Sequence, residues 1–146
     1  MQIEIVKLRE NAIIPTYGTE LAAGADLYAA IDNSIKIDPH GTEMVPTGIA
    51  LSIPEGYFGG VYARSGLSSK EGLRPANCVG VVDADYTGEI MVAVHNDCDG
   101  TYKVISPGQR IAQLVIQPYL KADFELVEAL EETDRGAGGF GSTGTN

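Results

Sequence analysis

Short apolar stretches separated by turn-forming residues recur along most of this sequence. The separators are rich in aspartate, proline and glycine, as in 38–41 and 106–108. Strands of this length at this spacing predict an all-β fold, either a sandwich or a barrel. The expected strands cover residues 3–8, 35–37, 45–53, 57–64, 79–82, 90–94, 102–105, 111–116 and 124–127.

Helical periodicity is nearly absent. One or two helical turns are expected over 65–70, and 124–132 is expected to be a strand that runs into an acidic linker. With 146 residues the chain can bury a core as a single domain. Because the composition shifts after Glu132, we expect a β domain over 1–132 and a flexible C-terminal segment over 133–146.

The C-terminal segment sets one arginine and one aromatic ring among glycines. It has too little apolar surface to offset the entropy of ordering itself, so on its own it should be flexible. One interpretation is a solubilising tail. The other is a lid over a nucleotide, in which Arg135 contacts phosphate, Phe140 contacts a flat ring and the glycine amides approach an anion.

The composition excludes several classes of protein. The two cysteines form no CxxC pair and the two histidines stand alone, which argues against structural zinc and favours reduced thiols. A net charge of -10 argues against binding to a nucleic acid polymer, although a small polyanion could still bind where cations gather or a divalent metal helps. A carboxylate lies where a signal peptide would be apolar, and no apolar run approaches about 18 residues. We therefore expect a soluble intracellular protein without a membrane segment.

The tripeptide Arg64-Ser65-Gly66 follows an expected strand and precedes the expected helical turn. A helix start leaves amide groups without partners, and these groups favour an anion. Arg64 and Ser65 would add directed donors. The alternative is an ordinary capped helix start, because serine is a favoured N-cap residue.

A second polar cluster follows the expected strand 79–82 and contains Asp83, Asp85 and Tyr86. Turn chemistry alone accounts for Asp85 and could account for Asp83. Alternatively, a carboxylate at a strand end can hold the water that hydrolyses a phosphoanhydride. With an ordinary pKa near 4, Asp83 would orient that water more than it would deprotonate it.

Two further segments carry isolated polar residues. Asp26 lies in what reads as a small apolar loop, where it could hold the water ligands of a metal or pair with an arginine across an interface. Arg110 and Gln113 are three apart on an expected strand, so their side chains should point to opposite faces. Arg110 could equally form a structural salt bridge.

Taken in their order along the chain, these segments resemble the five motifs of the trimeric dUTP diphosphatase (dUTPase) family. The resemblance runs from Ala23 to Gly144 and rests on AGADLYA, ARSGL, VGVVDADYTGEI, PGQRIAQL and RGAGGFGSTG. Val82 stands where relatives often carry isoleucine, which leaves the polarity unchanged. The resemblance implies a distorted jelly-roll or barrel-like fold and a homotrimer whose active sites are shared between subunits.

The resemblance also implies hydrolysis of dUTP to dUMP and pyrophosphate with Mg²⁺, which keeps uracil out of DNA and supplies dUMP for thymidylate synthesis. Asp83 would hold the attacking water, and Asp26 would serve Mg²⁺ through water or lie at the subunit boundary. The remaining implied roles concern the substrate. Arg64, Ser65, Gly66 and Gln113 would bind the phosphate chain, and Arg135 would reach the terminal phosphate. Asn77 and the backbone of Gly80, Val81, Val82 and Asp83 would bind the edge of uracil, with Met91 flanking the pocket. Tyr86 would lie against deoxyribose, Phe140 would stack on uracil, and Gly141 would also contact the substrate.

Two other functions compete with this interpretation. One is another enzyme on a related fold, a dCTP deaminase or a bifunctional deaminase and diphosphatase, which would lack the glycine-rich tail with its phenylalanine. The other is a binding or regulatory protein that kept the fold without catalysis. The complete set of residues from Asp83 to Phe140 favours an active hydrolase.

Overall fold

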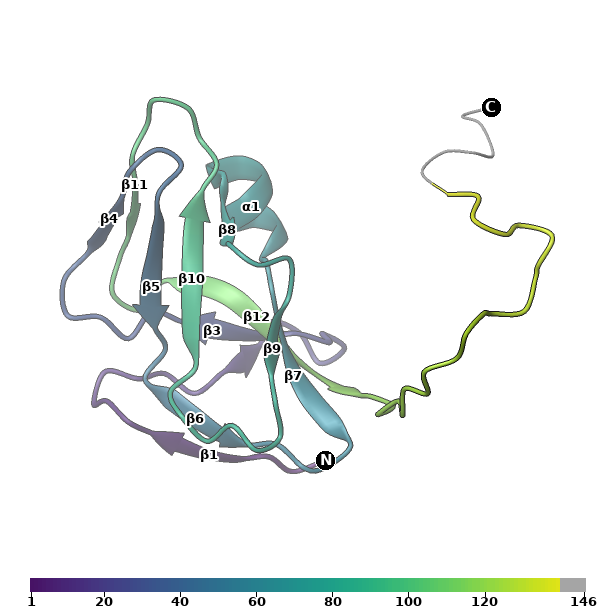
Figure 1. Ribbon diagram of the computed structural model, residues 1–146. Coiled ribbons are helices and arrows are strands. Elements are labelled where there is room, and N and C mark those ends of the chain that lie inside the picture. Colours follow the sequence, from purple (N-terminus) through teal and green to yellow (C-terminus); the bar gives the residue numbers. More distant parts are fainter. Residues whose placement is uncertain (140–146) are drawn as a thin grey trace.

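The computed structural model describes residues 1–139 and consists mostly of antiparallel strands with one short helix (Figure 1). The elements are β1 (Glu4–Lys7), β2 (Thr16–Tyr17), β3 (Ala25–Tyr28), β4 (Ile35–Ile37), β5 (Thr42–Pro46), β6 (Ile49–Ser52), β7 (Tyr57–Tyr62), α1 (Ser65–Glu71), β8 (Leu73–Pro75), β9 (Gly80–Val82), β10 (Met91–Asn96), β11 (Lys103–Ile105) and β12 (Arg110–Pro118). The prediction of an all-β fold with one short helix is confirmed.

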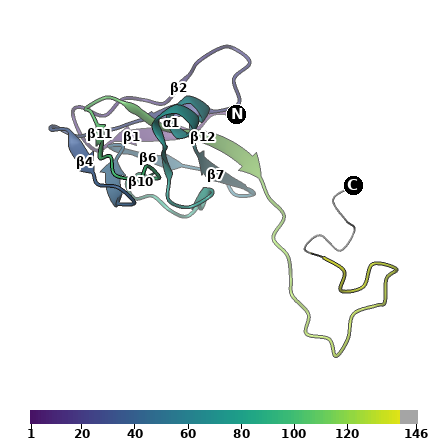
Figure 2. The ribbon, with the colours of Figure 1, turned by 90° about the horizontal axis from the view of Figure 1, so that it is seen from above.

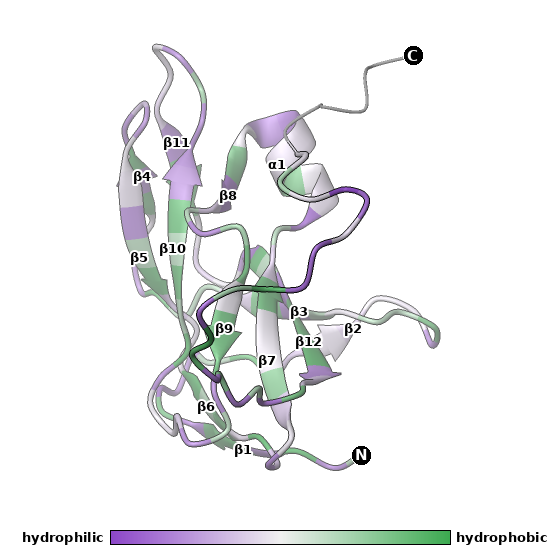
Figure 3. Cartoon of the chain, turned by 45° about the vertical axis from the view of Figure 1, so that its right-hand side comes forward, coloured by the Kyte–Doolittle hydropathy of each residue, from purple (hydrophilic) through white to green (hydrophobic). Residues whose placement is uncertain are grey.

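The largest sheet has the strand order β2-β3-β12-β7-β9, and β12 is its long central strand. A second sheet has the order β5-β10-β8, while β1 pairs with β6 and β11 pairs with β4. These sheets enclose one apolar core, to which β10 contributes alternate side chains, with Val92 and Val94 buried and Met91 exposed. Apolar residues accordingly line β7, β9 and β12 (Figure 3).

The structure corrects several of the expected strands. The stretch 45–53 is divided into β5 and β6, because Gly48 between them has a φ of 70°, a left-handed conformation that favours glycine. Strands β2, β3 and β8 were not expected, since each is too short or too polar to show a clear period. The predicted strand over 124–127 is wrong: this segment has no regular structure, and Phe124 is 96% exposed.

After β12 the chain leaves the sheets as an extended arm (Figures 1 and 2). Its apolar side chains are exposed, including Leu120, Phe124, Leu126 and Leu130. An apolar residue in a segment without a neighbouring strand has no core to enter, so hydrophobicity alone misled the prediction here.

Asn96, at the end of β10, is a buried polar residue with no exposed surface. Its Nδ2 donates to the carbonyls of Ile37 and Thr101 at 3.1 and 2.8 Å. Its Oδ1 accepts from the amide of Cys98 at 3.0 Å. The side chain of Asn96 therefore forms hydrogen bonds with backbone groups at the end of β4 and in the turn between β10 and β11.

We expect Asn96→Asp to lower the free energy of unfolding by about 3 kcal/mol or more, because an acceptor would face carbonyl oxygens in a buried site. Chemical denaturation followed by circular dichroism measures the change. Asn33→Asp, at an exposed position, is the matched control and should stay near the parent. Equal stability of the two variants would contradict a stabilising role for the hydrogen bonds of Asn96.

Candidate functional site

A pocket of about 290 Å³ lies between β9 and β10. Strand β9 is the edge strand of the large sheet and pairs only with β7 among the described residues. An edge strand presents backbone amides and carbonyls that no neighbouring strand uses. The pocket contains all the predicted residues of this hairpin: Asn77, Gly80, Val81, Val82, Asp83, Tyr86 and Met91.

The side chains of β9 show how this strand can serve the pocket. Val82 points into the core and is 9% exposed, while Val81 on the opposite face is 63% exposed. A Cβ at Gly80 would lie 3.1 Å from Cβ of Val61 and 3.3 Å from Nδ2 of Asn77. The strand therefore offers mainly its backbone, and Gly80 permits the close packing.

Tyr86 is fixed at both its backbone and its hydroxyl. Its amide donates to the carbonyl of Asp83 at 3.1 Å, and its hydroxyl donates to the carbonyl of Glu89 at 2.8 Å. Gly88 gives the ring room, since a Cβ there would lie 2.7 Å from the hydroxyl.

Glu89 also lines this pocket, and its importance was missed in the sequence. Its carboxylate accepts hydrogen bonds from Arg9 and from the amide of Gly48. The hydrogen bond from Arg9 is the main cause that lowers the pKa of Glu89, against an opposing effect of burial. Only the fold brings Arg9 to this position, so no local motif could have revealed the pair.

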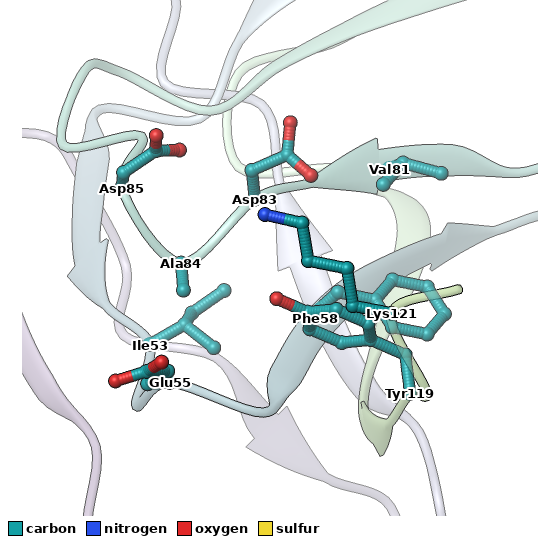
Figure 4. Close-up of a pocket in the computed structure, with 9 residues that line it drawn as sticks. All are labelled: Ile53, Glu55, Phe58, Val81, Asp83, Ala84, Asp85, Tyr119 and Lys121. Carbon is teal, nitrogen blue, oxygen red and sulfur yellow. The ribbon is translucent and has the colours of Figure 1, made fainter. Parts of the chain in front are cut away.

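Asp83 follows β9 and lies between the hairpin pocket and a larger cavity of about 810 Å³. Figure 4 shows Asp83 and Asp85 on one side of this cavity and the rings of Phe58 and Tyr119 on another. The two rings meet edge to face, with centroids 6.4 Å apart. Because the smaller pocket holds the polar hairpin residues, it is the better candidate for recognition of a base.

Asp26 lies in β3 and not in a loop, and it is 4% exposed. Its carboxylate accepts from Nε of Arg64 at 2.7 Å and from Nη1 of Arg110 at 3.2 Å. The arginine partners that the sequence left open are therefore supplied by the same chain. Two guanidinium groups compensate the cost of burying this carboxylate.

The prediction that Arg110 and Gln113 point to opposite faces is wrong. The register pairs Arg110 with Tyr28 but Ala112 with Leu27, so a bulge adds one residue to β12. Paired residues lie on the same face of a sheet, and Gln113 pairs with Asp26. Arg110, Gln113 and Asp26 consequently share one face.

Arg64, Ser65 and Gly66 lie where β7 leads into α1. Arg64 is the N-cap residue, and no side chain caps the helix. Ser65 is already inside the helix, and its carbonyl accepts from the hydroxyl of Ser69 at 2.6 Å, so the alternative of a serine-capped start is not what forms. Arg64 and Gly66 line a cavity different from the hairpin pocket, together with Lys70 and Lys103.

In the C-terminal arm, Arg135 is exposed and its Nε donates to the carbonyl of Gly138 at 2.7 Å. The arm lies away from the sheets (Figures 1 and 2). Phe140, which is predicted to stack on the base, and Gly141, which is predicted to contact the substrate, lie outside the described residues.

Residues 1–139 contain no cluster of three or more His, Cys, Asp or Glu side chains that could hold a metal ion. Across the same residues no helix is long and apolar enough to cross a membrane.

Comparisons with known proteins show which family this chain resembles. The dUTPase family model matches residues 10–144. The deoxyuridine 5'-triphosphate nucleotidohydrolase of Syntrophotalea carbinolica is 49% identical over 142 residues, which cover 97% of this chain and 96% of the relative. The enzyme of the same name from Desulfitobacterium hafniense is 45% identical and covers 100% of this chain and 98% of the relative.

Solved structures show the same similarity. The dUTPase of Staphylococcus bacteriophage 80alpha with dUPNHPP has a TM-score of 0.85 and 30% identity, with 99% of each chain covered. A mutant dUTPase from phage phi11 of S. aureus, whose structure shows the coordination of a structural Mg(II) ion, has a TM-score of 0.80 and 28% identity, covering 90% of this chain and 100% of the other. Since the family model spans most of the sequence and close relatives cover nearly all of it, this chain belongs to the dUTPase family.

Proposed function

We propose that this protein is a dUTP diphosphatase, which hydrolyses dUTP to dUMP and pyrophosphate by attack of water on the α-phosphorus. The observation that carries the proposal is the hairpin pocket, where an edge strand, a tyrosine and a carboxylate come together. The relatives named deoxyuridine 5'-triphosphate nucleotidohydrolase support the choice of substrate.

The backbone of β9 would select the base. Uracil presents acceptor, donor and acceptor groups along one edge, and a strand offers the matching amides and carbonyls. Cytosine would place a donor against a donor, and a buried mismatch of this kind costs about 1 to 3 kcal/mol. Asn77 and Met91 would flank the base, because both line the pocket.

The phosphate chain would lie against Arg64, Ser65, Gly66 and Gln113. Asp26 accepts from Nε of Arg64, which orients the guanidinium so that its terminal nitrogens could face an anion. Asp26 would affect Mg²⁺ only indirectly, through this arginine or through water. Mg²⁺ itself would neutralise charge on the phosphates and orient them.

A homotrimer would complete the site. Within one chain, Arg64 and Gly66 line a cavity different from the pocket that holds Tyr86 and Asp83. A shared site would bring the phosphate-binding set of one subunit to the hairpin of another. In this arrangement residues 1–132 form the β domain, and 133–146 form a lid that brings Arg135 to the terminal phosphate and Phe140 to the base of a neighbouring site.

Asp83→Asn tests the role of the water-holding carboxylate. We expect kcat for dUTP to fall by roughly 10² to 10⁴-fold, while affinity for a non-hydrolysable imido analogue of dUTP stays near the parent value. Pyrophosphate release and calorimetry measure the two quantities. Asp85→Asn is the control variant. If Asp83→Asn lost affinity for the analogue by as large a factor as it lost kcat, the result would contradict a role for Asp83 in holding water.

Tyr86→Ala tests whether this tyrosine discriminates between deoxyribose and ribose. Removing the ring should open space for a 2'-hydroxyl, so the ratio of kcat/KM for dUTP to that for UTP should fall by roughly tenfold or more. Tyr17→Ala removes an exposed tyrosine from β2 and should leave the ratio unchanged. If Tyr86→Ala rejects UTP as strongly as the parent, the sugar is read elsewhere.

Truncation after Glu132 tests the lid. The trimer should persist in light scattering, while turnover of dUTP should fall by roughly 10³-fold or more, because the arginine would no longer reach the transition state. Arg135→Ala in the full chain separates the arginine from the rest of the segment. Full activity of the truncated chain would rule out a lid.

A further inference from the structure

The carboxylate of Glu89 is held by groups from two distant parts of the chain. Nε of Arg9 donates to Oε1 at 2.8 Å, and Nη2 of Arg9 donates to Oε2 at 3.1 Å. The amide of Gly48 donates to Oε1 at 2.9 Å. A two-point contact with a planar guanidinium fixes direction as well as distance.

The backbone next to Glu89 is fixed to the same region. Ile90 is 2% exposed, and its amide donates to the carbonyl of Ile49 at 2.9 Å. The carbonyl of Ile90 accepts from the hydroxyl of Thr47 at 2.6 Å. Glu89 and Ile90 are therefore anchored to 47–49, so the carbonyl of Glu89 has a defined position.

That carbonyl is the acceptor for the hydroxyl of Tyr86. The ring of Tyr86 is 47% exposed, so packing covers only part of it. A half-exposed aromatic ring can change rotamer unless a polar contact holds its tip. The hydrogen bond to the carbonyl of Glu89 supplies this contact. Glu89 therefore links the two residues, because its carboxylate binds Arg9 and its carbonyl binds Tyr86.

Local features show that this arrangement is tightly specified. Gly48 has a φ of 70°, and a Cβ there would lie 2.7 Å from Cβ of Ala12 and 2.9 Å from Cβ of Ala30. Its amide is thus aimed at Glu89 by a backbone that other residues rarely adopt. Partly exposed ion pairs generally contribute little to stability, so the main effect of this pair is on position.

We propose that Glu89, held by Arg9 and Gly48, is a positioning residue that fixes the ring of Tyr86 and so sets the preference for deoxyribose over ribose. This inference rests on the proposed function, in which Tyr86 lies against the sugar. Neither Glu89 nor Arg9 contacts the reacting phosphorus in this scheme. Their removal should therefore change selection of the sugar more than turnover of the preferred nucleotide.

The test compares Glu89→Ala and Arg9→Ala with the parent on dUTP and UTP in the presence of Mg²⁺. The ratio of kcat/KM for dUTP to that for UTP should fall by about tenfold, because the carbonyl of Glu89 that accepts from Tyr86 is held less firmly once the bonds to its carboxylate are lost. The kcat for dUTP should change much less than this ratio. Glu89→Gln keeps an oxygen for Arg9 and Gly48 and should restore most of the ratio.

A double-mutant cycle separates positioning from a general structural effect. If Glu89 acts through the ring, Tyr86→Ala and the double variant with Glu89→Ala should show the same ratio. Lys36→Ala is the matched control for Arg9→Ala, because it removes the basic partner of an exposed ion pair with Asp38, away from the hairpin pocket. Its ratio should equal that of the parent.

An unchanged ratio in folded Glu89→Ala and Arg9→Ala would overturn the inference, as would additive effects in the cycle. If Glu89→Ala does not fold, Arg9→Ala and Tyr86→Phe carry the test, since Tyr86→Phe removes only the hydroxyl that reaches Glu89. The parent distinguishes the two proposals. Failure of the parent to hydrolyse dUTP would reject the proposed function, whereas a selective parent with equally selective variants would reject only the role of Glu89.

Discussion

Among the described residues β9 is an edge strand whose outer side pairs with no other strand, and the candidate site is built around it. A sheet must end somewhere, and its last strand leaves a row of backbone donors and acceptors without strand partners. In this chain that edge faces a pocket, with β10 of the second sheet opposite it. The side chain of Val82 is buried in the core, and β9 lines the pocket.

A second constraint is electrostatic. An acidic protein can bind an anionic ligand only where positively charged side chains are held close to it. The net charge is -10, yet carboxylates are used to place arginines. Asp26 holds Arg64 and Arg110, and Glu89 holds Arg9. In both places a carboxylate pairs with arginine from a distant segment, with two arginines at Asp26 and one at Glu89. Acidic residues here define geometry as well as charge.

Particular residues show which parts of the structure could be predicted from the sequence. Turn residues and apolar stretches predicted most strands and the helix at 65–70, because local chemistry governs both. The same reasoning failed at 124–127, where apolar residues have no neighbouring strand. It also failed for Arg110 and Gln113, because a bulge changes which side chains share a face and leaves no clear trace in composition.

By itself, the sequence determined the all-β class, the family and the hairpin residues that meet in one pocket. These properties depend on local patterns and on motifs whose members lie close together in the chain. Only the tertiary structure decided that Arg9 joins Glu89, that Asp26 is buried between two arginines, and that Arg64 and Tyr86 line different cavities. Contacts between distant segments depend on sheet order and register, which single residues do not encode.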